Sequence, residues 1–307
     1  MYCIAVDAGG TKTLFSLFNE NSEVIYKIEL GTCHHMQVGY EGLYNIITEG
    51  INKVMSNHYV KVERDELIIS LGLAGYGNNL EVRKQIENSV EKACNGIEYI
   101  IHNDVEIAMK GALAGNDGIV VIAGTGSIAF SMNKGITKRV GGWGYNIGDE
   151  GSAYWIGNKT LNTFSKKADG RLPKGKLYDL IMDKFNLKDD YEMISYVNNE
   201  LKMKREKIAK LSLICSQAAK YGDKEAIEIF DNAAKELSKL INLLLDDFEQ
   251  DQVDVSYIGG VFKAEDIIKL PLAKYIDKKG LLKNPIYSPE YGAYLYAKDM
   301  QKKENHN

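Results

Sequence analysis

Two acidic positions in the sequence have the residue types needed to act on a hydroxyl group, the first as a proton acceptor and the second as hydrogen-bond acceptors. The first is Asp104, which follows Asn103 directly after an apolar stretch that we expect to be a strand. In α/β sheets, ligands bind beyond the carboxyl ends of the strands, so a carboxylate there could accept the proton of an attacking hydroxyl. Asp and Asn are also good helix N-caps, and capping of a helix that starts at Val105 accounts for the spacing equally well.

The second acidic position is a carboxylate pair in a glycine-rich loop. The segment GGWGYNIGDEGSAYW, residues 141–155, holds both tryptophans of the chain, and its carboxylates Asp149 and Glu150 precede an expected helix that they could cap. Capping leaves the glycines and Trp143 unexplained. A polyol ligand would explain them, because it needs paired acceptors, exposed backbone groups and an apolar ring against its C–H face. Trp155 falls about one turn into the helix and is expected in the core.

Two further glycine-rich turns have the composition of an anion-binding backbone. DAGGTKT covers residues 7–13, and AGTGS covers residues 123–127. Such turns can present several backbone N–H groups to an anion with no side chain in the way. Neither is a P-loop, because the pattern G-x-x-x-x-G-K-[ST] is missing. Together with a third pair, Gly259-Gly260 at the end of an expected strand, they predict a cradle for a nucleoside triphosphate.

The second of these turns also matches the dinucleotide fingerprint G-x-G-x-x-[GA], over residues 124–129. That fingerprint has to open a helix. The residues that follow have the pattern of a strand over 128–132 and a turn over 133–135. The sequence therefore predicts a hairpin here, and a dehydrogenase-type crossover is disfavoured.

The elements that position these groups alternate between strand and helix patterns, which is typical of an α/β protein. We expect strands at 2–6, 67–73, 99–102 and 253–258, helices at 42–57, 80–93, 105–114 and from 289, and a mostly helical segment from 152 to 248. IAVDAGGTKTLFSLF from Ile4 and IVVIAGTGSIAFSMN from Ile119 share a strand–turn–strand pattern, which suggests two related halves. The predicted domains are residues 1–115, completed by a C-terminal helix at 289–303, and residues 116–288.

Composition limits the functional classes. The chain has 307 residues and a formal net charge of −4, which provides no electrostatic footprint for nucleic acid or an anionic membrane. Its four cysteines lack metal or disulfide spacing, and neither a secretory signal nor a membrane-spanning run is apparent, so we expect a cytoplasmic protein with reduced thiols. One local basic cluster is interpreted as a solvated helix face: Lys202, Lys204, Arg205 and Lys207.

The motifs occur in an order that resembles N-acetylglucosamine kinases of the BadF/BadG-type ATPase group, within the hexokinase–actin–Hsp70 superfamily. The resemblance rests on DAGGTKT, NDVEIA, AGTGS, GGWGYNIGDEGSAYW, Gly259-Gly260 and PEYGA at 289–293, and it spans essentially the whole chain. It implies two actin-like (ribonuclease H-like) α/β domains that close over a cleft. It also implies transfer of phosphate from ATP, with Mg²⁺, to the 6-hydroxyl of an amino sugar. N-acetylglucosamine is the first expectation, and N-acetylmuramic acid and glucosamine are alternatives. A homodimer is common among relatives.

The resemblance also assigns roles to residues of this chain. Asp104 matches the catalytic base, and Asp7 would orient Mg²⁺ through water. The predicted nucleotide contacts are Gly10, Thr11, Lys12, Thr125, Gly126, Ala209, Gly259 and Gly260. The predicted substrate contacts are His34, Asn103, Gly142, Trp143, Gly144 and Asp149.

The chain departs from the family pattern at His34. The family usually has Asn in this slot, whereas this chain has Gly31-Thr32-Cys33-His34-His35. The histidine pair could bind the sugar or be an incidental surface feature, and a metal site is not expected because no carboxylate or cysteine lies at a suitable spacing. Two other functions stay open, namely an ATPase that acts on a partner protein and a sugar or nucleotide sensor. The cysteines do not match the cluster ligands of ATPases that activate iron–sulfur dehydratases.

Overall fold

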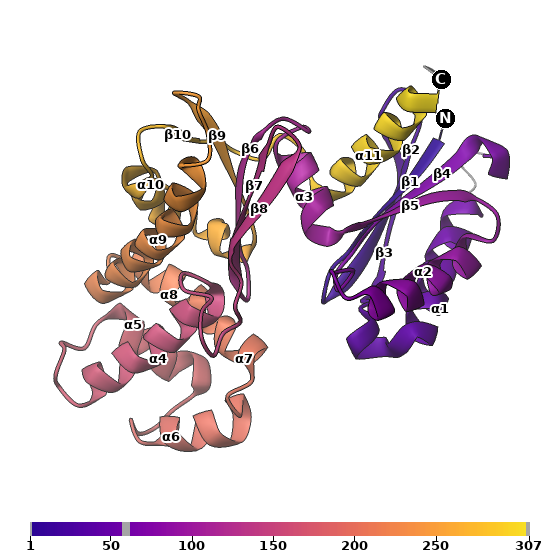
Figure 1. The fold of residues 1–307 in the computed structure, drawn as a ribbon. Coiled ribbons are helices and arrows are strands. Elements are labelled where there is room, and N and C mark those ends of the chain that lie inside the picture. The colour runs from indigo at the N-terminus through magenta and orange to yellow at the C-terminus, as the bar shows by residue number, and fades with distance from the viewer. Residues whose placement is uncertain (1, 57–61, 305–307) are drawn as a thin grey trace. The chain divides into compact units, whose positions relative to one another are not determined.

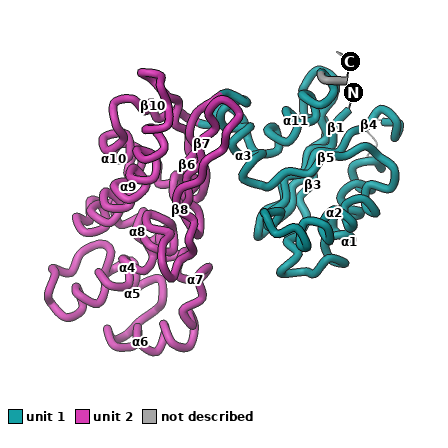
Figure 2. Tube along the Cα trace, in the orientation of Figure 1, with its two compact units in different colours: residues 1–116, 285–307 teal, residues 117–284 magenta. Residues whose placement is uncertain are grey.

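The chain forms two compact units, which Figure 2 distinguishes by colour. The computed structural model describes residues 2–56 and 62–304. Unit 1 comprises residues 1–116 and 285–307, and unit 2 comprises residues 117–284. Each unit contains a five-stranded mixed sheet with helices packed on it, which confirms the expected α/β class.

The sheet of unit 1 has the strand order β3-β2-β1-β4-β5. Its strands are β1 (Tyr2–Ala8), β2 (Lys12–Phe18), β3 (Val24–Gly31), β4 (Leu67–Leu73) and β5 (Glu98–Asn103). β1, β2 and β3 are antiparallel neighbours, whereas β4 and β5 run parallel to β1. In this register Ala8 pairs with Leu73, and Leu73 with Asn103, so the three parallel strands end at the same edge of the sheet.

Helices cover both faces of this sheet. They are α1 (His35–Met55), α2 (Leu80–Cys94), α3 (Asp104–Ala112) and α11 (Pro289–Glu304), with a 3₁₀ turn at Arg64–Glu66. Side chains alternate along β1: Ile4 and Val6 join the core beneath α1 and α2, whereas Cys3 and Ala5 join a second core with α3 and α11. Figure 1 shows α1 and α2 on one side of the sheet and α11 on the other.

The first helix differs from the expectation at both ends. It begins at His35 rather than near residue 42, and a non-helical Gly39 (φ 71°) interrupts it. This kink separates the first turn from the regular apolar pattern that starts at Leu43, which is why periodicity alone placed the start too late. Residue 57 of the expected helix lies outside the described residues.

The sheet of unit 2 has the order β10-β9-β6-β7-β8. Its strands are β6 (Gly118–Ala123), β7 (Ser127–Asn133), β8 (Ile136–Gly141), β9 (Val253–Ile258) and β10 (Gly280–Leu282). β6, β7 and β8 are antiparallel neighbours, while β9 is parallel to β6 and β10 to β9. The turn at 124–126 therefore joins a hairpin, as predicted. Both sheets have three antiparallel strands followed by two parallel ones, as the repeated strand–turn–strand pattern suggests.

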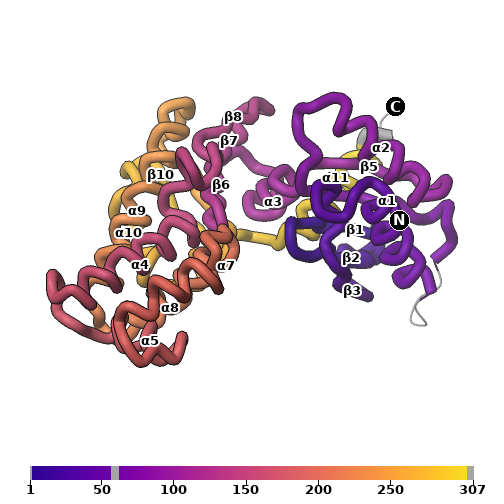
Figure 3. Tube along the Cα trace, turned by 90° about the horizontal axis from the view of Figure 1, so that it is seen from below, coloured from indigo at the N-terminus to yellow at the C-terminus, as the bar shows by residue number. Residues whose placement is uncertain are grey.

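Most of the remaining chain of unit 2 is helical. The helices are α4 (Ala153–Ala168), α5 (Lys176–Phe185), α6 (Glu192–Tyr196), α7 (Arg205–Ala209), α8 (Leu211–Lys220), α9 (Lys224–Leu245) and α10 (Asp266–Tyr275), with a π turn at Val197–Leu201 and a 3₁₀ turn at Gly260–Ala264. α9 packs across β6, β7 and β8, and α10 lies beside α9 (Figure 3). No helix in the described residues is both long and apolar enough to span a membrane.

Candidate active site

The turn between β1 and β2 leaves backbone donors available. Two of its carbonyl groups accept hydrogen bonds from side chains, because Thr32 Oγ1 donates to Gly9 O at 2.9 Å and Gln37 Nε2 donates to Gly10 O at 2.7 Å. The N–H groups of Gly10 and Thr11 make no hydrogen bond within residues 2–56 and 62–304, and both residues are exposed. This turn can therefore donate to an anion without breaking any internal bond.

Asp7 lies just before this turn, near the carboxyl end of β1, in an environment that is unfavourable for a charge. Burial raises the pKa of Asp7 to about 6, and the negative charges of Glu290 and Asp104 add to the effect. Lys12, a predicted nucleotide contact, is exposed and forms an ion pair with Glu29 on β3. The side chain of Asp7 makes no hydrogen bond or ion pair in the described part of the chain, so its carboxylate is available to a cation.

The hydrogen bonds at the end of β5 show which of Asn103 and Asp104 is the N-cap of α3. Asn103 is the N-cap: its Oδ1 accepts from Val105 N at 2.9 Å, and Glu106 Oε2 accepts from Asn103 N at 2.7 Å. The Asn103 amide also donates to Tyr76 O at 3.1 Å. Asn103 therefore bonds to the protein through both ends of its amide. Asp104 is the first helical residue, and burial raises the pKa of its carboxyl above the ordinary value, although the Val105 N–H opposes this.

The histidine pair lies half-buried beyond the carboxyl end of β4. His34 caps α1, because its Nδ1 accepts from Met36 N at 3.2 Å. Its ring stacks on His35 with centroids 5.0 Å apart, and His35 stacks on Tyr40 at 5.6 Å. A Cβ on Gly75 would lie 3.1 Å from His34 Nε2, so the imidazole packs against the loop that follows β4. Burial, and then the charge of His34, lower the pKa of His35.

In unit 2, the turn between β6 and β7 is joined to the loop over residues 141–152. Ser127 Oγ donates to Glu150 O at 2.7 Å, and Ala153 N donates to Gly124 O at 2.8 Å. Gly142 N donates to Ser127 O at 3.1 Å. Two motifs that are separate in the sequence are thus one hydrogen-bonded structure.

The same turn keeps two donors free. Gly124 N donates to Gly126 O at 2.9 Å, which closes the turn. The N–H groups of Thr125 and Gly126 have no partner in the described residues, and Thr125 is exposed. The turn in unit 2 therefore offers an anion the same kind of backbone donors as the turn in unit 1.

The glycines of the loop are required by its backbone. Gly141, Gly142 and Gly144 have φ values of 78°, 72° and 90°, a region in which side chains are disfavoured. Trp143 lies between them with 73% of its surface exposed, as the predicted contact with an apolar sugar face requires. Asp149 is also in the left-handed region, at φ 60°, but is only 4% exposed. A non-glycine residue held in this conformation is often functional.

Asp149 has a partner that the sequence interpretation missed. Arg205 Nη2 forms an ion pair with Asp149 Oδ2 at 2.8 Å, and Gly144 N donates to Asp149 Oδ1 at 3.3 Å. The interpretation of the 202–207 cluster as a solvated face is therefore wrong for Arg205, although its three lysines are exposed. Arg205 lies one turn before the predicted nucleotide contact Ala209, and this i, i+4 spacing is the signal that could have identified it.

The remaining predicted nucleotide contacts adjoin the turn or a hollow beside it. A Cβ on Gly259 (φ 117°) would lie 2.4 Å from Ala123 O, so the end of β9 touches the end of β6. Ala209 is buried, and Ser212 Oγ donates to its carbonyl at 2.7 Å. A hollow of about 240 Å³ is lined by Ser212, Leu213, Ser216, Gln217, Lys220, Phe230, Gly260, Val261, Lys263 and Ala264. It places Gly260 opposite α8 and is large enough to hold part of a nucleoside.

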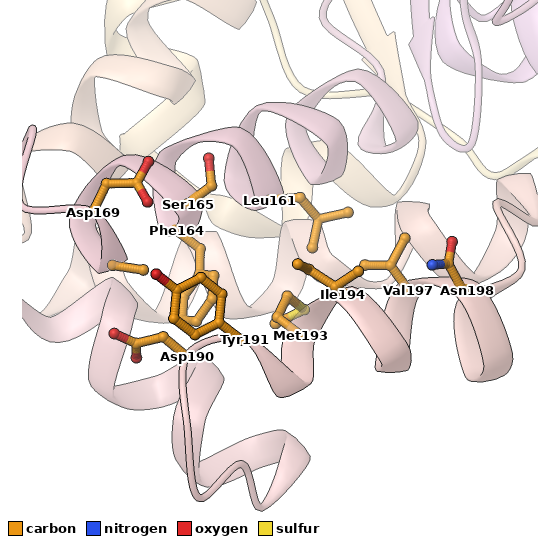
Figure 4. Close-up of a pocket in the computed structure, with 11 residues that line it drawn as sticks. Leu161, Phe164, Ser165, Asp169, Asp190, Tyr191, Met193, Ile194, Val197 and Asn198 are labelled. Atoms are coloured by element: carbon orange, nitrogen blue, oxygen red, sulfur yellow. The ribbon is translucent and has the colours of Figure 1, made fainter.

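A more apolar pocket of about 370 Å³ lies elsewhere in unit 2, between α4 and α6. Figure 4 shows Leu161, Ile194 and Val197 in its wall, with Asp169 and Asp190 together near one end. None of the predicted site residues lines it. Both of its carboxylates form ion pairs, Asp169 with Arg171 and Asp190 with Lys174.

Comparison with known proteins identifies relatives over almost the full length. The model of the BadF/BadG/BcrA/BcrD ATPase family matches residues 4–297. The N-acetylmuramic acid/N-acetylglucosamine kinase of Clostridium acetobutylicum is 31% identical over 263 residues, which are 85% of each chain. The N-acetyl-D-glucosamine kinase of Dictyostelium discoideum is 29% identical and covers 97% of this chain and 98% of its own.

A solved structure supports the fold. A protein from Chromobacterium violaceum, described as a candidate N-acetylglucosamine kinase, superposes with a TM-score of 0.73 at 24% identity. The match covers 96% of this chain and 98% of the other. The two-sheet α/β fold is therefore shared with this protein.

Proposed function

The chain belongs to the BadF/BadG/BcrA/BcrD ATPase family, and we propose that it is an ATP-dependent kinase for the 6-hydroxyl of an amino sugar, with N-acetylglucosamine as the first candidate. The observation that carries this proposal is the Asp104 carboxyl, which burial keeps less acidic than usual, at a position directly after the N-cap Asn103. The names of two relatives, in which N-acetylglucosamine recurs, support the substrate class.

In the proposed reaction, Asp104 accepts the proton of the 6-hydroxyl as the sugar oxygen bonds to the γ-phosphorus. The bond between the γ-phosphorus and the bridging oxygen breaks, and ADP leaves with its electron pair. A base with a raised pKa is better matched to neutral pH, and a positioned base contributes on the order of 10²–10⁴-fold. Phosphoryl transfer otherwise needs positioning and charge stabilisation.

Backbone donors would hold the phosphates. The free N–H groups of Gly10 and Thr11 in one turn and of Thr125 and Gly126 in the other need no rearrangement before an oxygen anion binds. Preorganised donors of this kind are worth more than mobile ones, because no reorganisation has to accompany the reaction.

Mg²⁺ fits the chemistry of Asp7. No group of three or more His, Cys, Asp or Glu side chains suited to a metal occurs in the described residues, so an all-protein cage is not formed there. Mg²⁺ usually binds through one or two carboxylates, water and the phosphates of the substrate. When bound, it would neutralise phosphate charge. Asp7, which is unpaired in the described residues and near two other acids, would hold it directly or through water.

The loop over residues 141–152 would hold the sugar. Trp143 offers an exposed ring for the C–H face, and Asp149 a carboxylate for ring hydroxyls. The resemblance places His34 in a slot where Asn is expected, and its Nε2 is the ring nitrogen that does not cap α1. An imidazole at this position would affect the choice between N-acetylglucosamine, N-acetylmuramic acid and glucosamine.

The decisive experiment measures ADP release from ATP and Mg²⁺ with a panel of acceptors: N-acetylglucosamine, N-acetylmuramic acid, N-acetylmannosamine, glucosamine, glucose and no sugar. Stimulation by one amino sugar, with its phosphorylated product detected by mass, is the expected result. Hydrolysis of ATP at a rate that no sugar changes would instead favour an ATPase acting on a partner protein. Nucleotide binding without turnover would favour a sensor.

Replacing the proposed base gives the first prediction. Asp104→Asn should lower kcat by at least ~10²-fold while leaving the Kd for the sugar and the thermal stability close to wild type, because only the proton acceptor is lost. Glu91→Gln, which removes an exposed carboxylate from α2, serves as the control. Full turnover in Asp104→Asn would remove Asp104 from the base role.

A further inference from the structure

Arg205 approaches the turn between β6 and β7 closely. A Cβ on Gly126 would lie 2.3 Å from Arg205 Nη2 and 2.5 Å from Asp149 Oδ2. The ion pair between these side chains therefore fills the space that a side chain at position 126 would need. Gly126 is not in the left-handed region, so close approach, and not backbone conformation, explains the glycine.

The guanidinium group of Arg205 keeps unused donors. Of its five N–H bonds, Nη2 supplies the bond to Asp149 at 2.8 Å, while Nε is buried and has no partner in the described residues. A buried donor without a partner costs stability, and such a group in a native structure needs an explanation. The Cζ atom of Arg205 lies over the ring of Tyr145, 5.4 Å from its centroid, in a cation–π contact. The side chain is 34% exposed, so a bound acceptor could reach those N–H groups of the guanidinium that are not buried.

The position and planar shape of the Arg205 guanidinium suit a phosphate as the acceptor. The free N–H groups of Thr125 and Gly126 belong to the turn that Arg205 contacts, so an anion there would meet backbone and side-chain donors together. Arginine presents a planar fork that can bind a carboxylate on one edge and a phosphate on another, which lysine cannot do. The lysines of the 202–207 cluster are exposed, and Arg205 alone is half-buried.

We propose that Arg205 bridges the Asp149 carboxylate and a phosphate oxygen of the bound nucleotide, and so acts as a positioning residue that links the sugar-holding loop to the phosphate-holding turn. The proposal rests on the proposed function for the role of Asp149. It has a consequence for binding: nucleotide should tighten the binding of sugar, and sugar that of nucleotide, by the same factor. Couplings of this kind are typically about 5–150-fold.

The test measures the binding of AMPPNP and of adenosine to the full chain, in wild type and in Arg205→Met. The variant should bind AMPPNP at least ~10-fold more weakly and adenosine as well as wild type does, because adenosine has no phosphate for the guanidinium to contact. Arg205→Lys should recover part of the AMPPNP affinity, since it restores the charge without the fork. Lys204→Met, which removes an exposed neighbouring cation, should bind AMPPNP normally.

A second arm repeats the AMPPNP titration with saturating N-acetylglucosamine. The wild type should show the coupling, and Arg205→Met should lose it. Unchanged AMPPNP binding in Arg205→Met would overturn the proposal. An equal loss of affinity for AMPPNP and for adenosine would overturn it too, because such a loss indicates a structural role for Arg205. A wild type that binds no sugar would refute the proposed function and leave the AMPPNP and adenosine arm to decide on Arg205. If Arg205→Met does not fold, the same comparison of AMPPNP and adenosine affinities in Arg205→Lys tests the proposal.

Discussion

The surroundings of the Asp7 carboxyl group disfavour its ionised form. Burial, and then the charges of Glu290 and Asp104, raise its pKa from 3.8 to about 6. The folded state therefore holds the proton at pH values where the unfolded chain has released it. The stability that this proton contributes is fully present below about pH 4 and is lost as the pH rises through about 6. At neutral pH the ionised carboxylate costs about 2–3 kcal/mol in the absence of a cation.

Asp7→Asn should accordingly stabilise the metal-free protein at pH 8, by up to ~2 kcal/mol, with a gain that shrinks as the pH falls and disappears below about pH 4. The measurement is chemical denaturation at a series of pH values, with the exposed Asp65→Asn as control. Added Mg²⁺ and AMPPNP should stabilise the wild type more than the variant. A gain that does not vary with pH would mean that the cost of Asp7 is not its charge.

At the scale of elements, the two glycines of the turn between β6 and β7 differ in what surrounds them. Gly126 faces the ion pair between Arg205 and Asp149, whereas a Cβ on Gly124 would meet nothing within 4 Å. Neither has a positive φ, so alanine is compatible with the backbone at both positions. The pair therefore separates the effect of crowding from that of losing a glycine.

Gly126→Ala should lower the free energy of unfolding by about 1–2 kcal/mol and weaken sugar binding, because the added methyl group displaces Asp149. Gly124→Ala should stay within ~0.5 kcal/mol of wild type. Denaturation curves and sugar titrations of both variants provide the comparison. Equal losses in the two variants would show that the ion pair can move aside without cost.

The regular elements were largely predictable from the sequence: β4 is a short, mostly apolar run, β9 alternates apolar and polar residues, and their predicted bounds, 67–73 and 253–258, match the structure. The glycine turns and Asp104 were also recognisable as candidates. The cap of α3 was not, because Asn103 and Asp104 both have capping side chains and only the geometry shows that Asn103 is the N-cap. The partner of Asp149 lies 56 positions away along the chain, in a cluster whose composition resembles a solvated face.

At the scale of the whole chain, unit 1 is assembled from two separate segments. The chain leaves it after residue 116 and returns at 285, and α11 then packs on α3, β1 and β4. The helix α3 touches the backbone of α11 and of the residue before it: a Cβ on Gly292 would lie 1.8 Å from Ile107 O, and one on Gly111 would lie 2.3 Å from Ser288 O. The glycine of the PEYGA motif is therefore explained by helix packing in unit 1 and needs no ligand.

Gly292→Ala tests whether this contact holds unit 1 together. Backbone atoms cannot move aside as a flexible side chain can, so the cost should reach about 3 kcal/mol, at the upper end for overpacking. Hydrogen exchange should then speed up in β1, β4, α3 and α11, while β6, β9 and α9, which belong to a different core, keep their protection. Gly77→Ala, at an open position of unit 1, should change neither set. Faster exchange in both sets would mean that unit 2 depends on the return of the chain into unit 1, so that the two cores unfold as one cooperative system.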